Sequence, residues 1–388
     1  MTPFRRPVRI AAVQHGDFSA AQRSIARGEP ESYFGISHAV GAVERLVEGK
    51  PHLIVSLGAP AGSERTPLGE NVGCPKPSWG RVPGTVAEWV WAGRWIEHLD
   101  RFRPTHLLLR AGGLPATRLL AWAARKHVTV MTIFHGYFDR ERRYFRLVNA
   151  RLANLLNRPN VYRVGNHRRP AADSMIACGV DPRKVVAFDW PGRPNPVNYA
   201  PRHLNAGPEP ELFYAGIVDR AKGVFDLTDA VRRLRARGIG ARLTVAGAGP
   251  DVANLTAEAA RLPAGAVNFL GVVPNTEVFA RMRAADVVCV PSRREFTEGF
   301  PKTLTEGLAS RTPVVISDHP VFVAALTGTA GVRWFRGGDA GDLANTVATL
   351  LTDPVLYRAT SEAAAEAFSR EECPNTFGDL LADWQRTL

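Results

Sequence analysis

The sequence predicts an α/β protein made of two domains, each built on a parallel β-sheet. Short apolar runs rich in β-branched residues alternate with helical patterns along the chain, which is the order expected of parallel strands joined by helices. At 388 residues the chain is long enough for two domains, each with its own hydrophobic core. A proline-rich stretch near the middle, residues 190–211, separates the two series of strands.

The clearest strands are short apolar runs, each followed by a loop or a helical pattern. In the first half they are expected at 8–13, 52–57, 105–110, 128–134 and 160–164, and in the second half at 211–216, 242–247, 267–271, 286–292 and 313–317. Helical patterns between the strands of the second half include 226–238 and 276–285.

The stretch 190–211 contains six prolines, which forbid a continuous helix or a central strand and suit an exposed linker. It predicts an N-terminal domain over residues 1–195 and a C-terminal domain over 196–370. Because open parallel sheets bind ligands beyond the carboxyl ends of their strands, we expect both sheets to direct those ends to a cleft between the domains.

Positive charge is concentrated in the first half. Residues 1–196 carry 29 lysines and arginines against 15 aspartates and glutamates, whereas residues 197–388 carry 20 against 22. This asymmetry fits an anionic membrane surface, a phosphate-bearing acceptor or nucleic acid as a partner of the first half. It equally fits an arginine-rich composition with solvated faces.

The sequence contains no run of 18 apolar residues that would form a transmembrane helix. The apolar run at the N-terminus is too short for a signal peptide. The four cysteines are far apart and form no metal-binding spacing, which indicates a reducing compartment and no metal site. We therefore expect a cytoplasmic protein, with peripheral attachment to the inner face of the plasma membrane as a possibility for the basic half.

Residues 287–318 form the most informative stretch, because a strand, a loop and a helix follow one another there. The helix is expected from Lys302 to Ser310. The backbone N–H groups of Gly299 and Phe300, with the helix dipole, would form an anion site suited to a diphosphate. Glu298 on the loop could reach sugar hydroxyls and Glu306 a ribose diol, although two such glutamates are usually part of a solvated face or salt bridges.

The whole string resembles the family 4 glycosyltransferases, whose signature is Pro-Ser, then Glu-Gly-Phe-Pro, then Glu, with seven residues between the glutamates. Glu298 and Glu306 match that spacing. The resemblance continues through 211–231, 242–255, 267–292 and 337–354, so it covers nearly all of residues 211–355. It implies the GT-B fold, with two Rossmann-like domains facing each other across a cleft and a last helix, 371–388, that crosses back to the first domain.

The resemblance also implies roles for residues of the second half. Lys222 would bind the donor diphosphate and neutralise the leaving group, and Gly216 would let the backbone approach the phosphates. Glu306 would bind the ribose, Glu298 the transferred sugar, and the backbone around Val273 the base.

The implied reaction is retaining transfer from a UDP- or GDP-sugar to a hydroxyl of a glycan, a lipid-linked acceptor or a small molecule. No metal or other cofactor is expected, because no Asp-x-Asp motif follows a strand, and nucleic acid is not an expected partner.

One position departs from the family pattern. The arginine that usually follows Gly216 is replaced by Ile217, and Arg220 in the same loop could supply the missing charge. If it does not, the alternative is a catalytically degenerate protein that binds a nucleotide sugar or glycan without transfer.

The first half carries fewer signals. His135 follows the strand 128–134, where family members often have a histidine that contacts the transferred sugar, so it is a candidate catalytic residue. Arg110 ends the strand 105–110 and is a candidate acceptor-binding residue. Gly35 is the only glycine in the turn that the family uses near the donor phosphate.

Two further helices are expected. The basic helix 140–159 either packs its apolar stripe on the sheet or docks on anionic lipid. In the tail, Trp384 is expected to pack in the core of the first domain.

Overall fold

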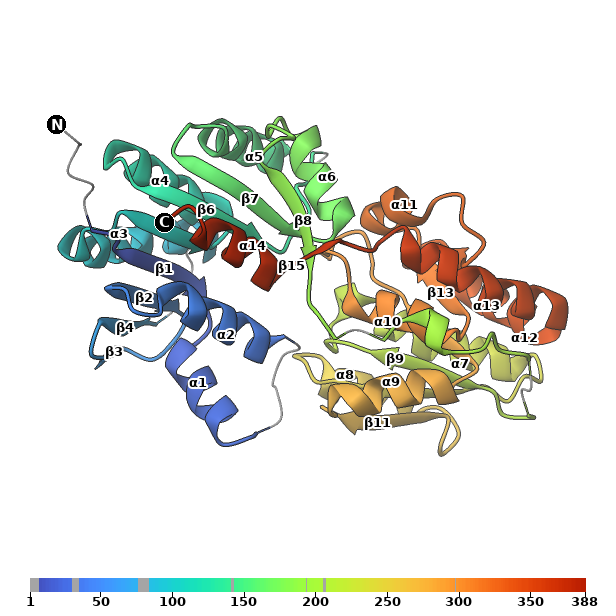
Figure 1. Cartoon of the computed structure of the whole chain (residues 1–388). Coiled ribbons are helices and arrows are strands. Elements are labelled where there is room, and N and C mark those ends of the chain that lie inside the picture. The colour runs from blue at the N-terminus through green and yellow to red at the C-terminus, as the bar shows by residue number, and fades with distance from the viewer. Residues whose placement is uncertain are drawn as a thin grey trace. The chain divides into compact units, whose positions relative to one another are not determined.

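A computed structural model of the 388-residue chain describes residues 7–29, 35–75, 84–140, 143–192, 194–204, 207–296 and 298–388. The chain forms two compact units (Figure 1). The first consists of residues 1–191 and 373–388, and the second of residues 192–372. The sequence places the two boundaries within a few residues of these, after residues 195 and 370.

The first unit is a sheet in the order β15-β8-β7-β6-β5-β1-β2-β4-β3, in which only β3 is antiparallel to its neighbour. Its strands are β1 (Ile10–His15), β2 (His52–Leu57), β3 (Gly62–Arg65), β4 (Gly69–Cys74), β5 (His106–Arg110), β6 (Thr129–Phe134), β7 (Val161–His167), β8 (Val185–Asp189) and β15 (Asn375–Thr376). Its helices are α1 (Phe18–Ala26), α2 (Ile36–Val47), α3 (Gly84–Phe102), α4 (Gly113–Arg125), α5 (Arg143–Leu156), α6 (Arg169–Ala177) and α14 (Phe377–Gln385).

Both faces of this sheet are covered, because successive residues of a strand point to opposite faces. In β1, Ala11 and Val13 belong to the core on the side of α3, α4 and α5. Ile10 and Ala12 belong to the core on the side of α1, α2 and α14. A strand buried on both faces is a continuous apolar run, which is why the sequence reveals it.

The C-terminal segment returns to the first unit. β15 pairs in parallel with β8, and α14 packs against α2 (Figure 1). Trp384 and Phe377 of α14 are fully buried in the core that α2 shares.

The second unit is a six-stranded sheet in the order β11-β10-β9-β12-β13-β14, with every pair parallel. Its strands are β9 (Glu211–Ala215), β10 (Arg242–Ala246), β11 (Val267–Gly271), β12 (Val287–Val290), β13 (Val314–Ser317) and β14 (Val332–Phe335). Its helices are α7 (Val224–Ala236), α8 (Val252–Ala259), α9 (Asn275–Ala284), α10 (Lys302–Ser310), α11 (Pro320–Leu326), α12 (Ala340–Thr352) and α13 (Pro354–Ser369), with two short 3₁₀ turns at Pro196–Asn198 and Arg220–Lys222.

The strand order reverses between β9 and β12, which makes the crevice beyond their carboxyl ends the expected ligand site of such a sheet. Helix α10 lies close over this part of the sheet. A Cβ at Gly307 would lie 3.2 Å from Cγ1 of Val288 on β12 and 3.1 Å from Cγ2 of Val314 on β13. The glycine therefore lets α10 approach the strands that carry the crevice.

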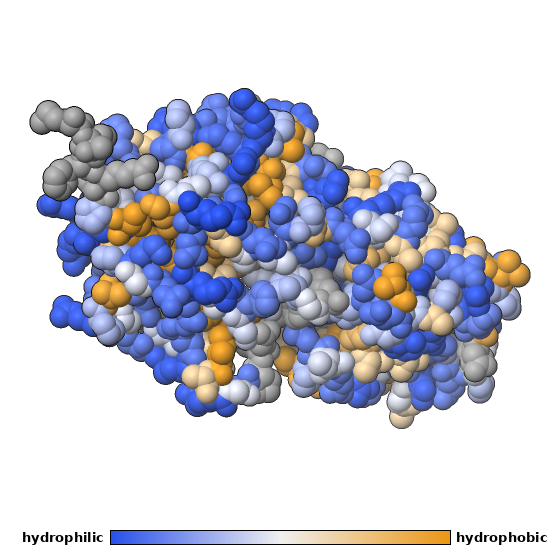
Figure 2. Space-filling model, in the orientation of Figure 1, coloured by the Kyte–Doolittle hydropathy of each residue, from blue (hydrophilic) through white to orange (hydrophobic). Residues whose placement is uncertain are grey.

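None of the helices in the described parts of the chain is both long and apolar enough to span a bilayer. On the face of the molecule shown in Figure 2, hydrophobic residues form separate patches within a mostly hydrophilic surface.

Candidate active site

The loops that follow β9 and β12 meet at the point where the strand order reverses. Gly223, with φ of +74°, ends the first loop, and a Cβ there would lie 2.0 Å from the carbonyl oxygen of Pro291. The backbone N–H of Arg293 donates to the carbonyl of Ala221 at 2.9 Å. Only glycine fits at residue 223 without moving the second loop, so this residue sets the approach of the two loops.

The centre of this site is a buried ion pair between Lys222 and Glu298. The Lys222 ammonium contacts Oε1 of Glu298, and the hydroxyl of Ser292 donates to the same oxygen at 2.5 Å. The two charged side chains are only 13% and 6% exposed. The ammonium also lies 4.4 Å from the ring centre of Phe296, a cation–π contact.

A second lysine–glutamate pair lies on helix α10. Lys302 Nζ is 2.9 Å from Oε1 of the buried Glu306, one helical turn later. Lys302 also donates to Oδ1 of Asn275 at 3.0 Å, which connects α10 to the loop containing Val273. The hydroxyl of Thr303 donates to the carbonyl of Ala215 at 3.2 Å, so the first turn of α10 lies at the carboxyl end of β9.

Gly299 and Phe300 directly precede Pro301, the N-cap residue of α10. Phe300 is buried, whereas Gly299 is partly exposed. Gly216 follows β9, and a Cβ at the neighbouring Gly247 would lie 1.9 Å from its carbonyl oxygen. The loops after β9 and β10 therefore pack backbone against backbone at these two glycines.

The structure does not bring Arg220 to the carboxylate of Glu298. Its guanidinium lies 3.8 Å from the ring centre of Phe225 and 3.7 Å from Oε1 of Glu258 on α8. Ile217 is half exposed, and its carbonyl accepts a hydrogen bond from the Tyr214 hydroxyl at 2.7 Å. Arg293, on the loop after β12, makes two hydrogen bonds of 2.6 and 2.9 Å to Asp226.

In the first unit, His135 follows the carboxyl end of β6 among aromatic rings. Its imidazole is nearly parallel to the Trp190 indole, at 8° and 6.0 Å between centroids, and meets Phe188 edge-on at 5.7 Å. The residue is exposed at the surface, where it lines a pocket of 290 Å³. Removal of water from the imidazole, and then the positive charge of Arg110, hold the pKa of His135 well below its usual range.

Gly35 has a left-handed backbone (φ +83°) at the start of α2, and a Cβ there would lie 2.8 Å from the Trp190 ring. The glycine thus makes room for the indole that faces His135. This contact gives Gly35 a packing role that the sequence pattern does not indicate.

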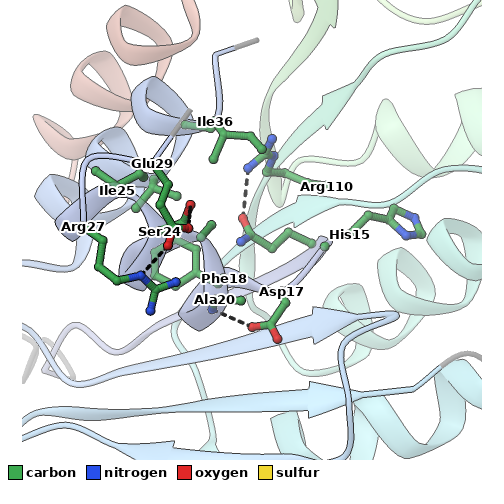
Figure 3. A pocket seen from close by; sticks show the side chains of 15 residues that line it. His15, Asp17, Phe18, Ala20, Ser24, Ile25, Arg27, Glu29, Ile36 and Arg110 are labelled. Carbon is green, nitrogen blue, oxygen red and sulfur yellow. Dashed lines mark hydrogen bonds and ion pairs between the residues drawn. The ribbon is translucent and has the colours of Figure 1, made fainter. Parts of the chain in front are cut away.

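Arg110 ends β5 and lines two pockets of the first unit. The guanidinium donates to Oε1 of Gln14 at 2.9 Å and lies 4.8 Å from the ring centre of Phe377. The larger pocket, of 490 Å³, lies between Arg110 and α1 (Figure 3). The smaller, of 290 Å³, is lined by both Arg110 and His135. Two of the three residues singled out in the first half, Arg110 and His135, therefore line the same pocket.

A buried polar cluster lies behind His135 and escaped the sequence analysis. Arg168, 1% exposed, is 2.9 Å from Oδ2 of Asp189, and His167 Nε2 is 3.3 Å from Oδ1. Burial lowers the pKa of His167 to about 3 and raises that of Asp189 to about 6. The signal that could have found them is position, because His167 and Asp189 are the last residues of β7 and β8.

Residues 198–367 match the protein family described as glycosyl transferases group 1. Glycogen synthase of Mycobacterium tuberculosis (strain H37Rv) is 31% identical over 200 residues, covering 51% of this chain and 44% of that protein. Phosphatidyl-myo-inositol mannosyltransferase of Mycobacterium leprae is 33% identical over 159 residues, covering 41% of each chain. The chain spans less than half the length of these curated relatives.

Residues 198–367, which lie in the second unit, are therefore identified as a domain of the glycosyl transferases group 1 family.

Solved structures show the same fold over nearly the whole chain. Sucrose-phosphate synthase from Thermosynechococcus elongatus matches with a TM-score of 0.63 at 16% identity, covering 98% of both chains. Anabaena Alr3699/HepE, in complex with UDP and glucose, matches with a TM-score of 0.61 at 13% identity, covering 98% of this chain and 99% of that one. The predicted GT-B fold with two parallel-sheet domains is confirmed.

Within the group 1 domain, the structure brings together Lys222 and Glu298, and it places Glu306 on the helix that follows. Sequence reasoning missed Ser292 and Lys302, the hydrogen-bond donors to these glutamates. Lys302 stands four residues before Glu306, a spacing that predicts an ion pair on any helix. The part of the chain that the structure describes contains no group of three metal-ligating side chains.

Proposed function

We propose that this protein is a retaining glycosyltransferase that moves a sugar from a nucleoside diphosphate sugar to an acceptor hydroxyl. The observation that carries the proposal is the buried Lys222–Glu298 pair at the switch point of a group 1 domain. A lysine at this point supplies positive charge to a departing diphosphate. The adjacent carboxylate accepts hydrogen bonds from the hydroxyls of the sugar.

The remaining donor contacts follow from the elements around this pair. The backbone N–H groups of Gly299 and Phe300, at the start of α10, face an anion with the positive end of the helix dipole. Glu306 binds the ribose diol and the backbone at Val273 the base, which agrees with the hydrogen bond from Lys302 to Asn275 next to that loop. The bare backbone at Gly216 lets the phosphates approach closely.

In the first unit, His135 contacts the transferred sugar near the reacting carbon, and Arg110 contacts the acceptor. The lowered pKa keeps His135 neutral at pH 7, so its imidazole can accept a hydrogen bond from a hydroxyl. Gly35 approaches the donor phosphate through the first N–H groups of α2.

Retention follows when the acceptor oxygen attacks the face of the anomeric carbon from which the diphosphate leaves. The new bond joins the acceptor oxygen to that carbon, the bond from the carbon to the β-phosphate oxygen breaks, and the diphosphate takes the electron pair. The hydroxyl proton passes to the departing phosphate oxygen. Lys222, Lys302 and the α10 dipole stabilise the leaving charge, so we propose that no metal ion is needed.

The names of related proteins suggest which donors and acceptors to test. One curated relative is described as GDP-mannose-dependent, and Anabaena Alr3699/HepE has been solved with UDP-glucose. UDP-glucose and GDP-mannose are therefore the first donors. Glycogen synthase and phosphatidyl-myo-inositol mannosyltransferase suggest glycans and lipid-linked compounds among the acceptors.

Isothermal titration with both donors, followed by mass spectrometry of the products with and without EDTA, tests the proposal. We expect binding, donor hydrolysis and transfer that persist in EDTA, with the anomeric configuration retained. Binding without turnover across donors and acceptors would favour the degenerate alternative that Ile217 suggests. Inverted products would contradict retention, and loss of activity in EDTA would contradict metal independence.

Attachment of the basic first half to membranes stays a separate prediction. Sedimentation with vesicles of anionic and of zwitterionic phospholipid tests it, with binding expected only to the anionic vesicles and weakened by salt.

A further inference from the structure

The pocket shared by Arg110 and His135 is unusually apolar for a site expected to receive sugars. Its volume is 290 Å³, and it lies at the carboxyl ends of β5 and β6 beneath the start of α5. Carbon-rich side chains from three elements line it, namely Leu114, Ile133, Phe134, Phe138, Phe145 and Val148. The polar lining groups are fewer: Arg110, His15 and His135 at the ends of strands, Asn149 and Tyr144 on α5, and Tyr137.

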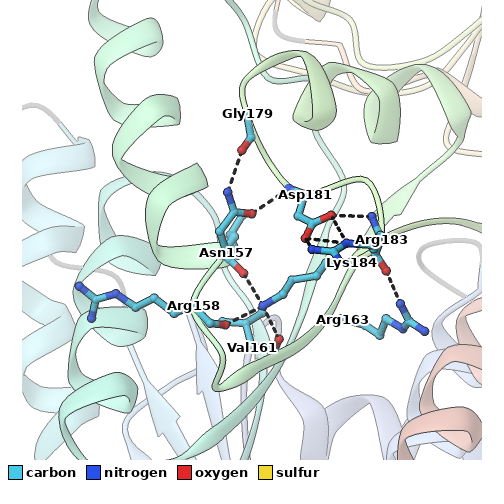
Figure 4. Close-up of polar contacts among 9 residues, drawn as sticks. Asn157, Arg158, Val161, Arg163, Gly179, Asp181, Arg183 and Lys184 are labelled. Atoms are coloured by element: carbon cyan, nitrogen blue, oxygen red, sulfur yellow. Dashed lines mark hydrogen bonds and ion pairs between the residues drawn. The ribbon is translucent and has the colours of Figure 1, made fainter.

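The helix that covers this pocket is anchored at its far end. Leu152 and Leu156 are buried in the core. Beyond them, Lys184 Nζ donates to the carbonyls of Arg158 at 2.6 Å and Val161 at 2.9 Å (Figure 4). Phe145 and Val148, nearer the start of α5, therefore line the pocket from a helix held in place by its other end.

A mainly apolar pocket with a few polar groups favours a mainly apolar occupant that carries a polar group. Burying a free sugar against these side chains would leave its hydroxyls without hydrogen-bond partners, at a cost for each one. A ring-sized hydrocarbon group suffers no such cost and gains from leaving water. A hydroxyl on that group would then lie on the side of His135.

We propose that this pocket binds the apolar part of the acceptor, and that the acceptor is an alcohol or phenol whose hydroxyl is carried by a ring-sized apolar group. The inference rests on the proposed function for the chemistry, but the pocket binds such a molecule whether or not a sugar is transferred. The bonds made and broken are those of the transfer already described, with the acceptor oxygen belonging to the apolar molecule.

Two glycines on the pocket wall allow it to be filled without strain. Gly112 and Gly136 line the pocket, neither has a positive φ, and a Cβ at either position would meet no atom within 4 Å. Gly62 lies outside the pocket, on the exposed strand β3, and a Cβ there would also meet no atom within 4 Å. Gly112→Val and Gly136→Val are thus matched with the control Gly62→Val.

The test measures binding of 2-naphthol by titration calorimetry and transfer from the active donor to 2-naphthol, n-octanol and glucose at equal concentrations. We expect 2-naphthol to bind, to outcompete glucose as acceptor, and to lose affinity about 10-fold or more in both pocket variants, since overpacking a filled site is costly. Gly62→Val should bind it like the wild type, and all three variants should bind UDP unchanged.

Absence of 2-naphthol binding, or equal binding in the filled and unfilled pockets, would overturn the inference. Preferred transfer to glucose would overturn it as well, and preference for n-octanol over 2-naphthol would assign the pocket to chain lipids instead. Failure of the proposed function looks different, because naphthol binding and its loss in the variants would then remain while no donor is turned over.

Discussion

Replacing Lys222 by methionine removes the positive charge at the centre of the proposed donor site while keeping most of the length of the side chain. In the folded protein, Glu298 would then be a carboxylate only 6% exposed, with the Ser292 hydroxyl still donating to it but without a cation. The change therefore affects the fold and the proposed reaction by separate routes, and both effects can be measured.

Removing one partner of a buried ion pair costs about 3–5 kcal/mol. Since Ser292 still donates to Glu298, we expect the lower end, about 3 kcal/mol of the free energy of unfolding. Loss of a charge that stabilises the leaving group should lower kcat for transfer about 100-fold or more, by analogy with removal of an oxyanion donor.

Urea unfolding measures the first quantity and mass-spectrometric transfer assays the second. Lys126→Met is the matched control, because Lys126 and Asp100 form an ion pair of 2.8 Å that is 54% and 43% exposed, and such pairs contribute less than about 1 kcal/mol. In the double variant Lys222→Met/Glu298→Gln, no buried charge is left unpaired, so stability should recover while transfer stays low.

Two results would refute this reasoning. Unchanged stability of Lys222→Met would show that Glu298 does not depend on the ammonium. Wild-type transfer by a destabilised variant would show that Lys222 supports only the fold.

Three other predictions concern single residues. Glu306→Ala should weaken UDP binding about 10-fold or more in calorimetric titrations, because a charged hydrogen bond to the ribose is lost; unchanged affinity would remove Glu306 from the site. Arg110→Gln should raise the pKa of His135, since a positive charge that disfavours the imidazolium is removed, and an NMR titration of the imidazole that shows no upward shift would contradict that cause. Phe377→Leu should lower transfer more than it lowers UDP affinity, because its ring lies 4.8 Å beneath Arg110 and 5.4 Å from Trp190; equal loss of both would indicate a general packing defect.

The sequence predicted best the elements whose residues are decided locally or by burial on both faces. β2 and β11 have the predicted bounds, 52–57 and 267–271, and α10 runs from Lys302 to Ser310 as expected. β2 is buried at five of its six residues, β11 is an edge strand that alternates apolar Val267 and Phe269 with Asn268, and α10 begins directly after a proline. Such patterns predict an element without knowledge of the rest of the fold.

The strands absent from the prediction are β3, β4, β8, β14 and β15, and two of them show why. β3, with the sequence Gly-Ser-Glu-Arg, is exposed throughout and exists only by pairing with β4. β15 is two residues long and pairs with β8, almost 190 positions earlier. Neither shows an apolar alternation, because β3 is exposed at every residue and β15 is too short to have a pattern.

In the candidate site, too, local features could be predicted from the sequence and contacts between distant residues could not. The spacing of Glu298 and Glu306 is a property of one loop and one helix, so the sequence displays it. The pairing of Glu298 with Lys222 joins residues 76 positions apart through two loops that Gly223 allows to touch. Arg220 stays a predicted donor residue, and the sequence did not indicate that its guanidinium would pack on Phe225 and lie near Glu258.

The pairing of both lysines with glutamates has a consequence for how the proposed donor binds. Lys222 and Lys302 each contact a buried carboxylate, so the site is balanced in charge before a diphosphate enters. If the Lys222 ammonium moves from Glu298 to a bound diphosphate, the buried carboxylate of Glu298 loses its cation and requires new hydrogen-bond donors. Sugar hydroxyls can supply them, whereas a nucleotide without a sugar cannot. Phosphate binding and sugar recognition are therefore coupled through one carboxylate, and the intact donor satisfies both lysine and glutamate where its separate parts would satisfy only one.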